Sequence, residues 1–244
     1  MINHIHYNVT QSTNSDLKRL LSEDANLPHL TVVSTAFQTS GRGQRENSWE
    51  SENGKNLLFS LLLRPISLKA TEAFAISRIV SVAIAKFLRK YISDVSIKWP
   101  NDIYWRDKKI CGILIENSIM GEYLDTSIVG VGLNINQREF SQNLPNPVSL
   151  TNITGKEFLL DKVLTEVVTS IEEEFVRYFE NRAKETESIY HQLIYRLDTK
   201  ALYKVAEVVV EAEIQGVCSD GRLILKHSDG NLRYYAFKEV TYML

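Results

Sequence analysis

The sequence is poor in the features that mark several classes of protein. It contains only two cysteines, Cys111 and Cys218, which lie far apart beside apolar residues and fit buried thiols in a reducing compartment, not disulfides or a Cys-x-x-Cys metal site. No apolar run approaches the ~18 residues that a membrane span needs, and no basic region followed by an apolar stretch opens the chain. We therefore expect a cytoplasmic protein.

Neither sign of charge dominates the chain. Its 244 residues carry a formal net charge of −2, which argues against DNA binding, because sequence-independent affinity for nucleic acid comes mainly from neutralising phosphates. A chain that is 44% hydrophobic and 24% charged is typical of a globular protein with one sizeable core and a small second module. His4 and His6 lie two residues apart, but no third metal ligand stands at a helpful spacing, and we interpret them as surface residues.

One long polar segment stands out from this composition. Thr39–Lys55 contains no leucine, isoleucine or valine, yet it joins two apolar stretches that are typical of buried strands, Thr31–Phe37 and Asn56–Leu63. A structureless loop of this length inside a compact domain is usually either functional or disordered. The segment is therefore the first candidate for a ligand site.

The residues of this loop suit the binding of a phosphate and a ring. Gly41 and Gly43 let the backbone approach a ligand, Arg42 and Arg45 supply fixed positive charge, and Trp49 offers a flat apolar face. Gly-Arg-Gly is also common in exposed turns, so by itself it leaves a merely flexible connection equally open.

Two further segments decide between these interpretations. They are Ser96–Ile103 (SIKWPNDI) and Lys109–Glu116 (KICGILIE). With the loop they resemble the signature of the biotin protein ligases: Gly-Arg-Gly ending in Trp, then Lys-Trp-Pro-Asn-Asp, then Lys-x-x-Gly-Ile-Leu. Ser12-Thr13-Asn14 upstream and residues 130–134 (GVGLN) downstream stand in the family's order, so the resemblance covers nearly the whole chain.

The resemblance implies an α+β fold. A mixed sheet packed with helices, the class II synthetase-like catalytic domain of biotin and lipoate ligases, is expected over residues 1–197, and a small SH3-like β-barrel over residues 198–244. The spacing of apolar residues and turns supports both parts. It predicts helices over Thr10–Ser22, Lys69–Ile92, Lys156–Phe179 and Lys184–Leu197, and late strands over Lys204–Gln215, Arg222–His227 and Arg233–Phe237.

Ser12-Thr13-Asn14 stands at a helix start. Thr13 and Asp16 fit the pattern of a hydroxyl cap followed three residues later by an acid. The resemblance adds that this turn hydrogen-bonds the ureido ring of biotin, and a helix start held by its cap is a good platform for such contacts. The residues that the resemblance assigns to biotin are Ser12, Thr13, Asn14, Gln38, Gly41, Arg42, Gly43, Gln44, Lys109 and Gly112.

Lys109 begins an otherwise apolar strand and by position alone could be the last exposed residue before the core. Adenylation, however, brings a substrate carboxylate and the α-phosphate of ATP together, and one ammonium with three donors can stabilise both in the transition state. The resemblance implies this role for Lys109, with Arg42 as a second catalytic residue, and Asp102 orienting or deprotonating the incoming amine. It assigns ATP to Arg45, Trp49, Asn101, Lys109 and Asn134.

The pattern Gly130-x-Gly132-x-Asn134 is not a dinucleotide-binding fingerprint. Ile135 stands where that fingerprint needs glycine or alanine, and no helix follows. We expect instead a strand whose glycines leave room for the ligand, and the resemblance places Asn134 against the adenine edge.

The implied reaction has two steps and needs no protein nucleophile. Biotin and ATP, with Mg²⁺ on the phosphates, give biotinyl-5′-AMP and pyrophosphate, and a lysine of a biotin carboxyl carrier domain then takes the biotin and releases AMP. The loop Thr39–Lys55 is expected to be mobile when empty and to order over the ligands, which would protect the adenylate from water. The family includes both monomers and homodimers, and the sequence does not distinguish them.

The loop departs from the usual family pattern, Gly-Arg-Gly-Arg-x-Gly-Arg-x-Trp. It has Gln44, Glu46 and Asn47 at changed positions, so it lacks two arginines of that pattern and gains an acid, which predicts weaker retention of the adenylate. This leaves a non-catalytic biotin-binding protein as an alternative, beside a lipoate or octanoate transferase of the same superfamily. Some relatives repress transcription through an amino-terminal DNA-binding domain, for which a motif beginning at Ser12 leaves no room.

Acidic residues in two segments complete these expectations. Glu172-Glu173-Glu174 lies on the predicted helix Lys156–Phe179, and we interpret the run as a solvated face. In the small carboxyl-terminal module, the resemblance brings residues 237–240 (FKEV) toward the active site, with Glu239 as the residue of interest.

Overall fold

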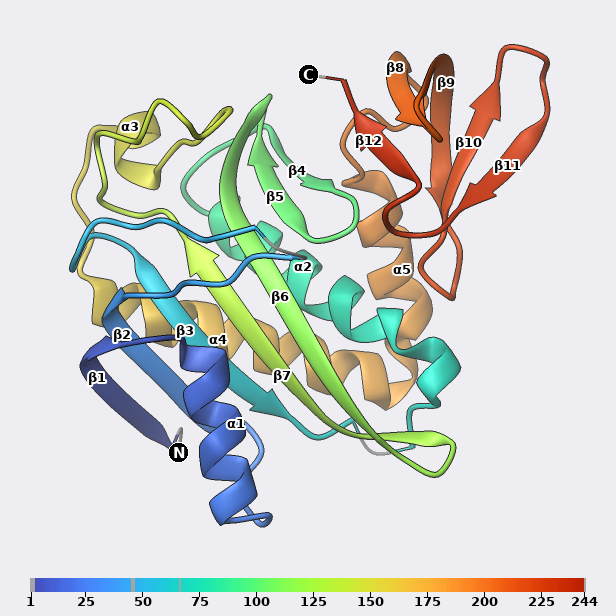
Figure 1. The fold of residues 1–244 in the computed structure, drawn as a ribbon. Coiled ribbons are helices and arrows are strands. Elements are labelled where there is room, and N and C mark those ends of the chain that lie inside the picture. The colour runs from blue at the N-terminus through green and yellow to red at the C-terminus, as the bar shows by residue number, and fades with distance from the viewer. Residues whose placement is uncertain (1–2, 45–46, 66, 244) are drawn as a thin grey trace.

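A seven-stranded mixed sheet forms the larger part of the computed structural model, which describes residues 3–44, 47–65 and 67–243. The strand order is β1-β2-β3-β7-β6-β5-β4 (Figure 1). β1 and β2 run parallel, and the other neighbouring pairs are antiparallel. The strands are β1 (His4–Thr10), β2 (Val32–Gln38), β3 (Leu57–Leu63), β4 (Val95–Lys98), β5 (Asp102–Trp105), β6 (Lys108–Met120) and β7 (Tyr123–Leu133).

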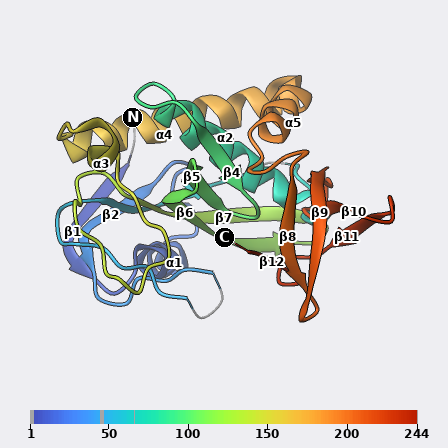
Figure 2. The same ribbon diagram turned by 90° about the horizontal axis from the view of Figure 1, so that it is seen from above.

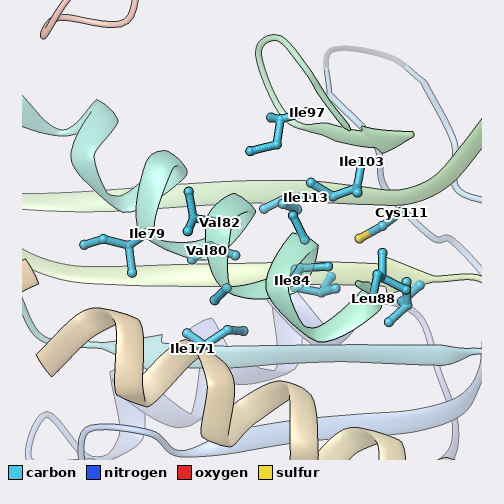
Figure 3. Close-up of a cluster of buried hydrophobic side chains, with 14 of the residues drawn as sticks. Ile79, Val80, Val82, Ile84, Leu88, Ile97, Ile103, Cys111, Ile113 and Ile171 are labelled. Atoms are coloured by element: carbon cyan, nitrogen blue, oxygen red, sulfur yellow. The ribbon is translucent and has the colours of Figure 1, made fainter. Parts of the chain in front are cut away.

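Helices cover both faces of this sheet. α1 (Thr13–Glu23) packs on one face, and α2 (Phe74–Leu88) and α4 (Leu160–Arg177) lie on the other (Figure 2). Because alternate side chains of a strand point to opposite faces, Leu62 packs with Leu17 of α1, whereas Leu61 belongs to the larger core under α2. That larger core brings α2 and α4 together against the sheet (Figure 3).

Three of the predicted helices are shorter in the structure. The predicted helix Lys69–Ile92 is a short 3₁₀ turn, η1 (Ala70–Glu72), followed by α2. The predicted helix Lys156–Phe179 starts later, at Leu160, and a separate short helix, α3 (Leu150–Thr154), precedes it. The last predicted helix is α5 (Ala183–Gln192), which follows the turn η2 (Tyr178–Arg182). It stops before Leu197 because the next residues leave it to hydrogen-bond with Ile97 of β4.

The strand β5 was absent from the sequence prediction. The motif Ser96–Ile103 is divided between two strands, since β4 ends at Lys98 and Asp102 opens β5. β5 pairs with β4 on one side and with β6 on the other. Asp102 is therefore held in the sheet, on the strand between the edge strand β4 and β6.

The carboxyl-terminal residues form a second, five-stranded antiparallel sheet with the order β11-β10-β9-β8-β12. This confirms the predicted α+β class with a separate late sheet. The strands are β8 (Lys200–Val205), β9 (Val208–Val217), β10 (Leu223–His227), β11 (Leu232–Tyr235) and β12 (Val240–Tyr242). The predicted strand Lys204–Gln215 was wrong, because the chain turns at Ala206 and Glu207 with φ of 44° and 69°. A division into domains at residues 197 and 198 stays a prediction.

Polar contacts join the two sheets. Arg78 of α2 is buried and donates to the carbonyls of Val217 and Cys218, and it also pairs with Glu187 at 3.1 Å. The indole of Trp99 donates to the carbonyl of Gly221 at 2.8 Å. The turn between β4 and β5 is therefore held by the second sheet.

Glu174 corrects the interpretation of the acidic run on α4. Its side chain is only 3% exposed, with the ammonium of Lys86 2.5 Å from one carboxylate oxygen. The hydroxyl of Thr186 donates to the other oxygen at 2.6 Å. Glu174 faces α2 and α5, and only Glu172 and Glu173 are exposed. Separately, none of the helices in the described part of the chain is both long and apolar enough to cross a bilayer.

Candidate active site

A cavity opens on the sheet where α1 begins, between the loop after β2 and strands β6 and β7. It brings together segments that are far apart in the chain: the start of α1, the polar loop, the turn before β5, and the middle of the sheet. Its lining includes most of the residues predicted from the sequence: Ser12, Thr13, Asn14, Gln38, Arg42, Gly43, Gln44, Trp49, Asn101, Lys109 and Gly112, joined by Ile113, Leu114, Gly130, Val131 and Gly132.

The polar end of the cavity is built at the start of α1. Ser12 is the N-cap residue but its side chain makes no capping hydrogen bond, and Thr13 lies inside the helix, so the predicted Thr13 and Asp16 cap was wrong. The Thr13 hydroxyl instead donates to the amide oxygen of Gln38 at 3.2 Å and lies 2.7 Å from the hydroxyl of Ser60. The Thr13 side chain is therefore held by tertiary contacts and not by a helix-capping bond.

An acid that the sequence analysis overlooked organises the next part of the wall. Glu116, on β6, accepts a hydrogen bond from the Asn14 amide at 2.7 Å and pairs with Arg42 at 3.0 Å through the same oxygen. Arg42 is therefore tied across the cavity to the sheet. Glu116 and Ser60 are both polar residues within apolar strand sequences, which is the signal that could have marked them.

Trp49 lies flat on the sheet above two glycines. A Cβ atom at Gly112 would be 2.8 Å from its ring, and one at Gly132 would be 2.3 Å away. The predicted open space above Gly132 is thus filled by the indole, and that above Gly130 is filled by the Asn14 side chain, 2.2 Å from a Cβ there. The glycines are needed for close approach of protein groups, so this prediction requires correction.

The polar loop is ordered by its own backbone. The Trp49 N–H donates to the Gly41 carbonyl at 2.9 Å, and the Gly43 N–H donates to the Asn47 carbonyl at 2.7 Å. Gly41 lies behind Trp49 and does not line the cavity. Arg45, predicted to contact ATP, lies outside the described residues.

Lys109 and Asp102 form an ion pair at the other end of the cavity. The ammonium of Lys109 lies 2.8 Å from a carboxylate oxygen of Asp102, and the two side chains are 32% and 17% exposed. The same ammonium lies 5.5 Å from the centre of the Trp49 ring. Asp102 does not line the cavity itself, but its ion pair with Lys109 connects it to the cavity wall.

Asn101 and Asn134 are fixed by backbone groups. The Asn101 amide donates to the Ile113 carbonyl at 2.5 Å, which holds the turn before β5 against β6. The Asn134 amide donates to the Val148 carbonyl at 3.1 Å, while its side-chain oxygen is buried without a partner among the described residues. Asn134 lies beyond the end of β7 and outside the cavity lining.

Among the described residues, the cavity lining offers charge and hydrogen bonds but no thiol or imidazole that could act as a nucleophile. Burial raises the pKa of the nearby Cys111 thiol far above its usual range, so that thiol stays protonated. His4 and His6 both hydrogen-bond Ser34, at 2.7 and 2.8 Å. No group of three histidines, cysteines or acids suited to a metal ion occurs within residues 3–44, 47–65 and 67–243.

Glu239 does not reach this cavity. Its carboxylate accepts the backbone N–H of Ala236 at 2.7 Å, and it lines a separate surface depression with Lys204. The neighbouring Phe237 does lie close to the site, since it lines a second hollow that shares Gln44 and Asn101 with the cavity.

Comparison with known proteins places these features in a family. The sequence profile of the "Biotin/lipoate A/B protein ligase family" matches residues 7–134. The chain is 26% identical over 237 residues to "Bifunctional ligase/repressor BirA" of Bacillus subtilis, covering 95% of this chain and 72% of that protein. It is 30% identical over 220 residues to "Biotin--protein ligase 1, chloroplastic" of Arabidopsis thaliana, covering 84% of this chain and 58% of that one.

Solved structures resemble the whole fold. The chain superposes on the biotin protein ligase from Aquifex aeolicus in complex with biotin and ATP with a TM-score of 0.82 and 26% identity, covering 100% of this chain and 99% of the other. The Leishmania major enzyme in complex with biotinyl-5-AMP shares the fold at a TM-score of 0.65 and 20% identity.

Proposed function

Because the chain belongs to the biotin/lipoate A/B protein ligase family, we propose that it is a biotin protein ligase, which activates biotin with ATP and transfers it to a lysine of a biotin carrier domain. The observation that carries this proposal is the placement of Lys109 and the Ser12-Thr13-Asn14 turn in one cavity. A polar end and a cationic end on one apolar sheet suit a ligand with a polar ring and a carboxylate.

Biotin fits this cavity with its ureido ring toward α1. The hydroxyls of Ser12 and Thr13 and the amide of Asn14 are at least 95% buried, so they offer donors and acceptors in a place of low water content. Such short polar side chains, held by Gln38 and Ser60, are suited to a ring that carries both a carbonyl and two N–H groups. The biotin carboxylate then points to Lys109.

Lys109 is the group that joins the two substrates. Its ammonium is a compact charge at the cavity end, and it can move from Asp102 toward an incoming carboxylate and α-phosphate. Stabilising the charge that both groups share in the transition state lowers the barrier to adenylation. Asp102 keeps the ammonium in place before the substrates arrive, and it is close enough to orient the acceptor amine in the second step.

The base of ATP fits beside Trp49 and Asn134. The buried side-chain oxygen of Asn134 lacks a partner among the described residues, and the amino group of adenine is a donor that would satisfy it. Trp49 supplies an apolar face for the ring. The Glu116 contact holds Arg42, a cation of the loop, near the cavity, and the loop closes over the phosphates.

Mg²⁺ accompanies ATP in this proposal and depends little on protein ligands. The described residues offer no cluster of acids for it, and Mg²⁺ readily keeps several water molecules and binds substrate phosphates. The carrier domain that accepts biotin is the partner. Its lysine approaches from the open side of the cavity, next to Asp102 and Lys109.

The test is the intact mass of an apo biotin carrier domain after incubation with this protein, biotin, ATP and Mg²⁺. We expect a gain of one biotinyl group per carrier, and no gain with Lys109→Ala. Lys109→Ala must still bind biotin in a calorimetric titration, since the ureido contacts are untouched. An unmodified carrier with the native protein, together with normal biotin binding, would refute the ligase activity.

A further inference from the structure

Lys98 is a cation next to the catalytic pair that the reaction described above does not use. It ends β4, and in the β4 and β5 ladder its Cα partner is Asp102. Side chains of directly opposed residues project from the same face of a sheet, with their Cβ atoms roughly 5 Å apart. Lys98 and Lys109 therefore stand on either side of one carboxylate.

Two aromatic rings hold the Lys98 ammonium. It lies 5.1 Å from the ring centre of Tyr104, two residues after Asp102 on the same face of β5, and 4.8 Å from that of Tyr242. Tyr242 belongs to β12 of the second sheet, so the two sheets meet at this lysine. Among the described residues, no hydrogen bond or ion pair to the ammonium accompanies these ring contacts.

The surroundings keep this ammonium poorly hydrated. Burial lowers the pKa of Lys98 below its usual value, and the negative charge of Asp102 opposes part of that effect. Arg196 is the other cation nearby, but its guanidinium donates to the Met243 carbonyl at 3.0 Å and lies over Tyr195. Lys98 is thus a cation whose cross-strand neighbour is Asp102 and whose ammonium makes no hydrogen bond or ion pair among the described residues.

The proposed reaction creates a need for such a cation. In the present structure Asp102 is paired with Lys109, at 2.8 Å. If Lys109 turns to the biotin carboxylate and the α-phosphate, Asp102 loses its partner. The Asp102 side chain is only 17% exposed, so its charge is then left unpaired at a partly desolvated position. A buried charge left without a partner is costly, and that cost would oppose the movement of Lys109.

On the basis of the proposed function, we infer that Lys98 is a positioning residue that takes over as counter-ion of Asp102 when Lys109 engages the substrates. Its ammonium needs only to swing from the rings of Tyr104 and Tyr242 toward its cross-strand neighbour. Because Tyr242 belongs to the second sheet, that sheet positions the Lys98 ammonium before the substrates bind. Lys98 touches neither substrate and acts only through Asp102.

The test is a double-mutant cycle on adenylation, read as the single-turnover burst of pyrophosphate with biotin, ATP and Mg²⁺. We expect Lys98→Met to slow the burst about tenfold, an ordinary coupling for charged neighbours, with the biotin half-saturation unchanged. Lys98→Arg should keep most of the rate because it keeps the charge. In an Asp102→Asn background, where no anion needs a counter-ion, Lys98→Met should change the rate by less than about twofold.

The ring contacts have a matched pair of variants. The hydroxyl of Tyr242 is buried without a partner among the described residues, so Tyr242→Phe keeps the ring and removes no hydrogen bond of the protein. We expect Tyr242→Phe to keep the native rate, and Tyr242→Leu to slow adenylation in the Asp102 background but not in Asp102→Asn. Thermal unfolding of each variant identifies any that simply fail to fold.

An equal loss from Lys98→Met in both backgrounds would overturn the inference, because Lys98 would then act independently of Asp102. So would a loss in Lys98→Arg as large as that in Lys98→Met. If the native chain releases no pyrophosphate with biotin, the proposed function fails, and this role fails with it. A native burst with no Lys98 effect rejects the counter-ion role alone.

Discussion

Replacing Gly132 by alanine tests the position of Trp49 directly. A Cβ atom there would meet three atoms of the Trp49 ring at 2.3 to 2.7 Å, and all three of its nearest neighbours belong to that ring. Non-bonded carbon atoms cannot approach so closely. Because Gly132 lies in a central strand and Trp49 in a loop, we expect the indole, and not the sheet, to move.

The size of the effect follows from this overlap. Overpacking by one methyl group typically costs about 1–3 kcal/mol. If the cost falls on the loop conformation that binds ATP, the half-saturating ATP concentration rises about 5- to 150-fold, at 1.4 kcal/mol for each factor of ten. The free energy of unfolding should change by less than about 0.5 kcal/mol, because a surface loop takes up the strain.

Pyrophosphate release at saturating biotin, with ATP varied, measures the first quantity, and urea denaturation measures the second. Gly130→Ala is a matched control in the same strand: its Cβ would lie 2.2 Å from the Asn14 side chain, so it should weaken biotin binding instead. In a Trp49→Ala background, Gly132→Ala should change the ATP dependence by less than about twofold. An unchanged ATP dependence in Gly132→Ala, or an equal penalty in both backgrounds, would refute the placement of Trp49.

Three further predictions concern charged groups. Glu116→Gln ends the partly exposed ion pair with Arg42 and should raise the half-saturating biotin concentration in steady-state kinetics by about fivefold or less. A larger rise would mean that Glu116 contacts biotin itself. Lys86→Met leaves the buried Glu174 carboxylate without its ammonium and should cost about 3 kcal/mol in urea denaturation, whereas a cost below about 1 kcal/mol would contradict the buried pair. Burial lowers the pKa of His29, whose ring nitrogen accepts a backbone N–H. Below about pH 6.5 the unfolded chain therefore binds more protons than the native one, so the free energy of unfolding falls as the pH falls. His29→Gln should flatten this fall between pH 7.5 and 5.5, and an equally steep fall in the variant would assign it to other histidines.

Several site residues could be predicted because they stand in short motifs whose chemistry is local. The loop with Arg42 and Trp49, and the strand that begins at Lys109, were predicted from residue type and spacing together with the family resemblance, and the structure brings them into one cavity. The ligand roles given to them stay predictions. The α+β class also followed from the sequence, since apolar periodicity reports which face of a helix or strand is buried.

Other features escaped because they depend on contacts between distant segments. Glu116 meets Asn14 and Arg42 only when β6 lies beside the start of α1, and its place as a polar residue in an apolar strand does not say which residues it contacts. The Thr13 and Asp16 cap was wrong because Gln38 and Ser60 supply better partners for the Thr13 hydroxyl. At Thr13 a tertiary hydrogen bond replaced the predicted local one.

The sequence by itself determined the α+β class and the chemical groups that the polar loop and the strand ends carry, because propensity, periodicity and charge are properties of neighbouring residues. Only the tertiary structure decided that Trp49 fills the space above Gly112 and Gly132 and that Glu174 is buried against Lys86. The same holds for the Lys98 ammonium, which lies over the rings of Tyr104 and Tyr242. Close packing selects such neighbours by shape and by the need to pair every buried charge, and that selection is made across the whole chain at once.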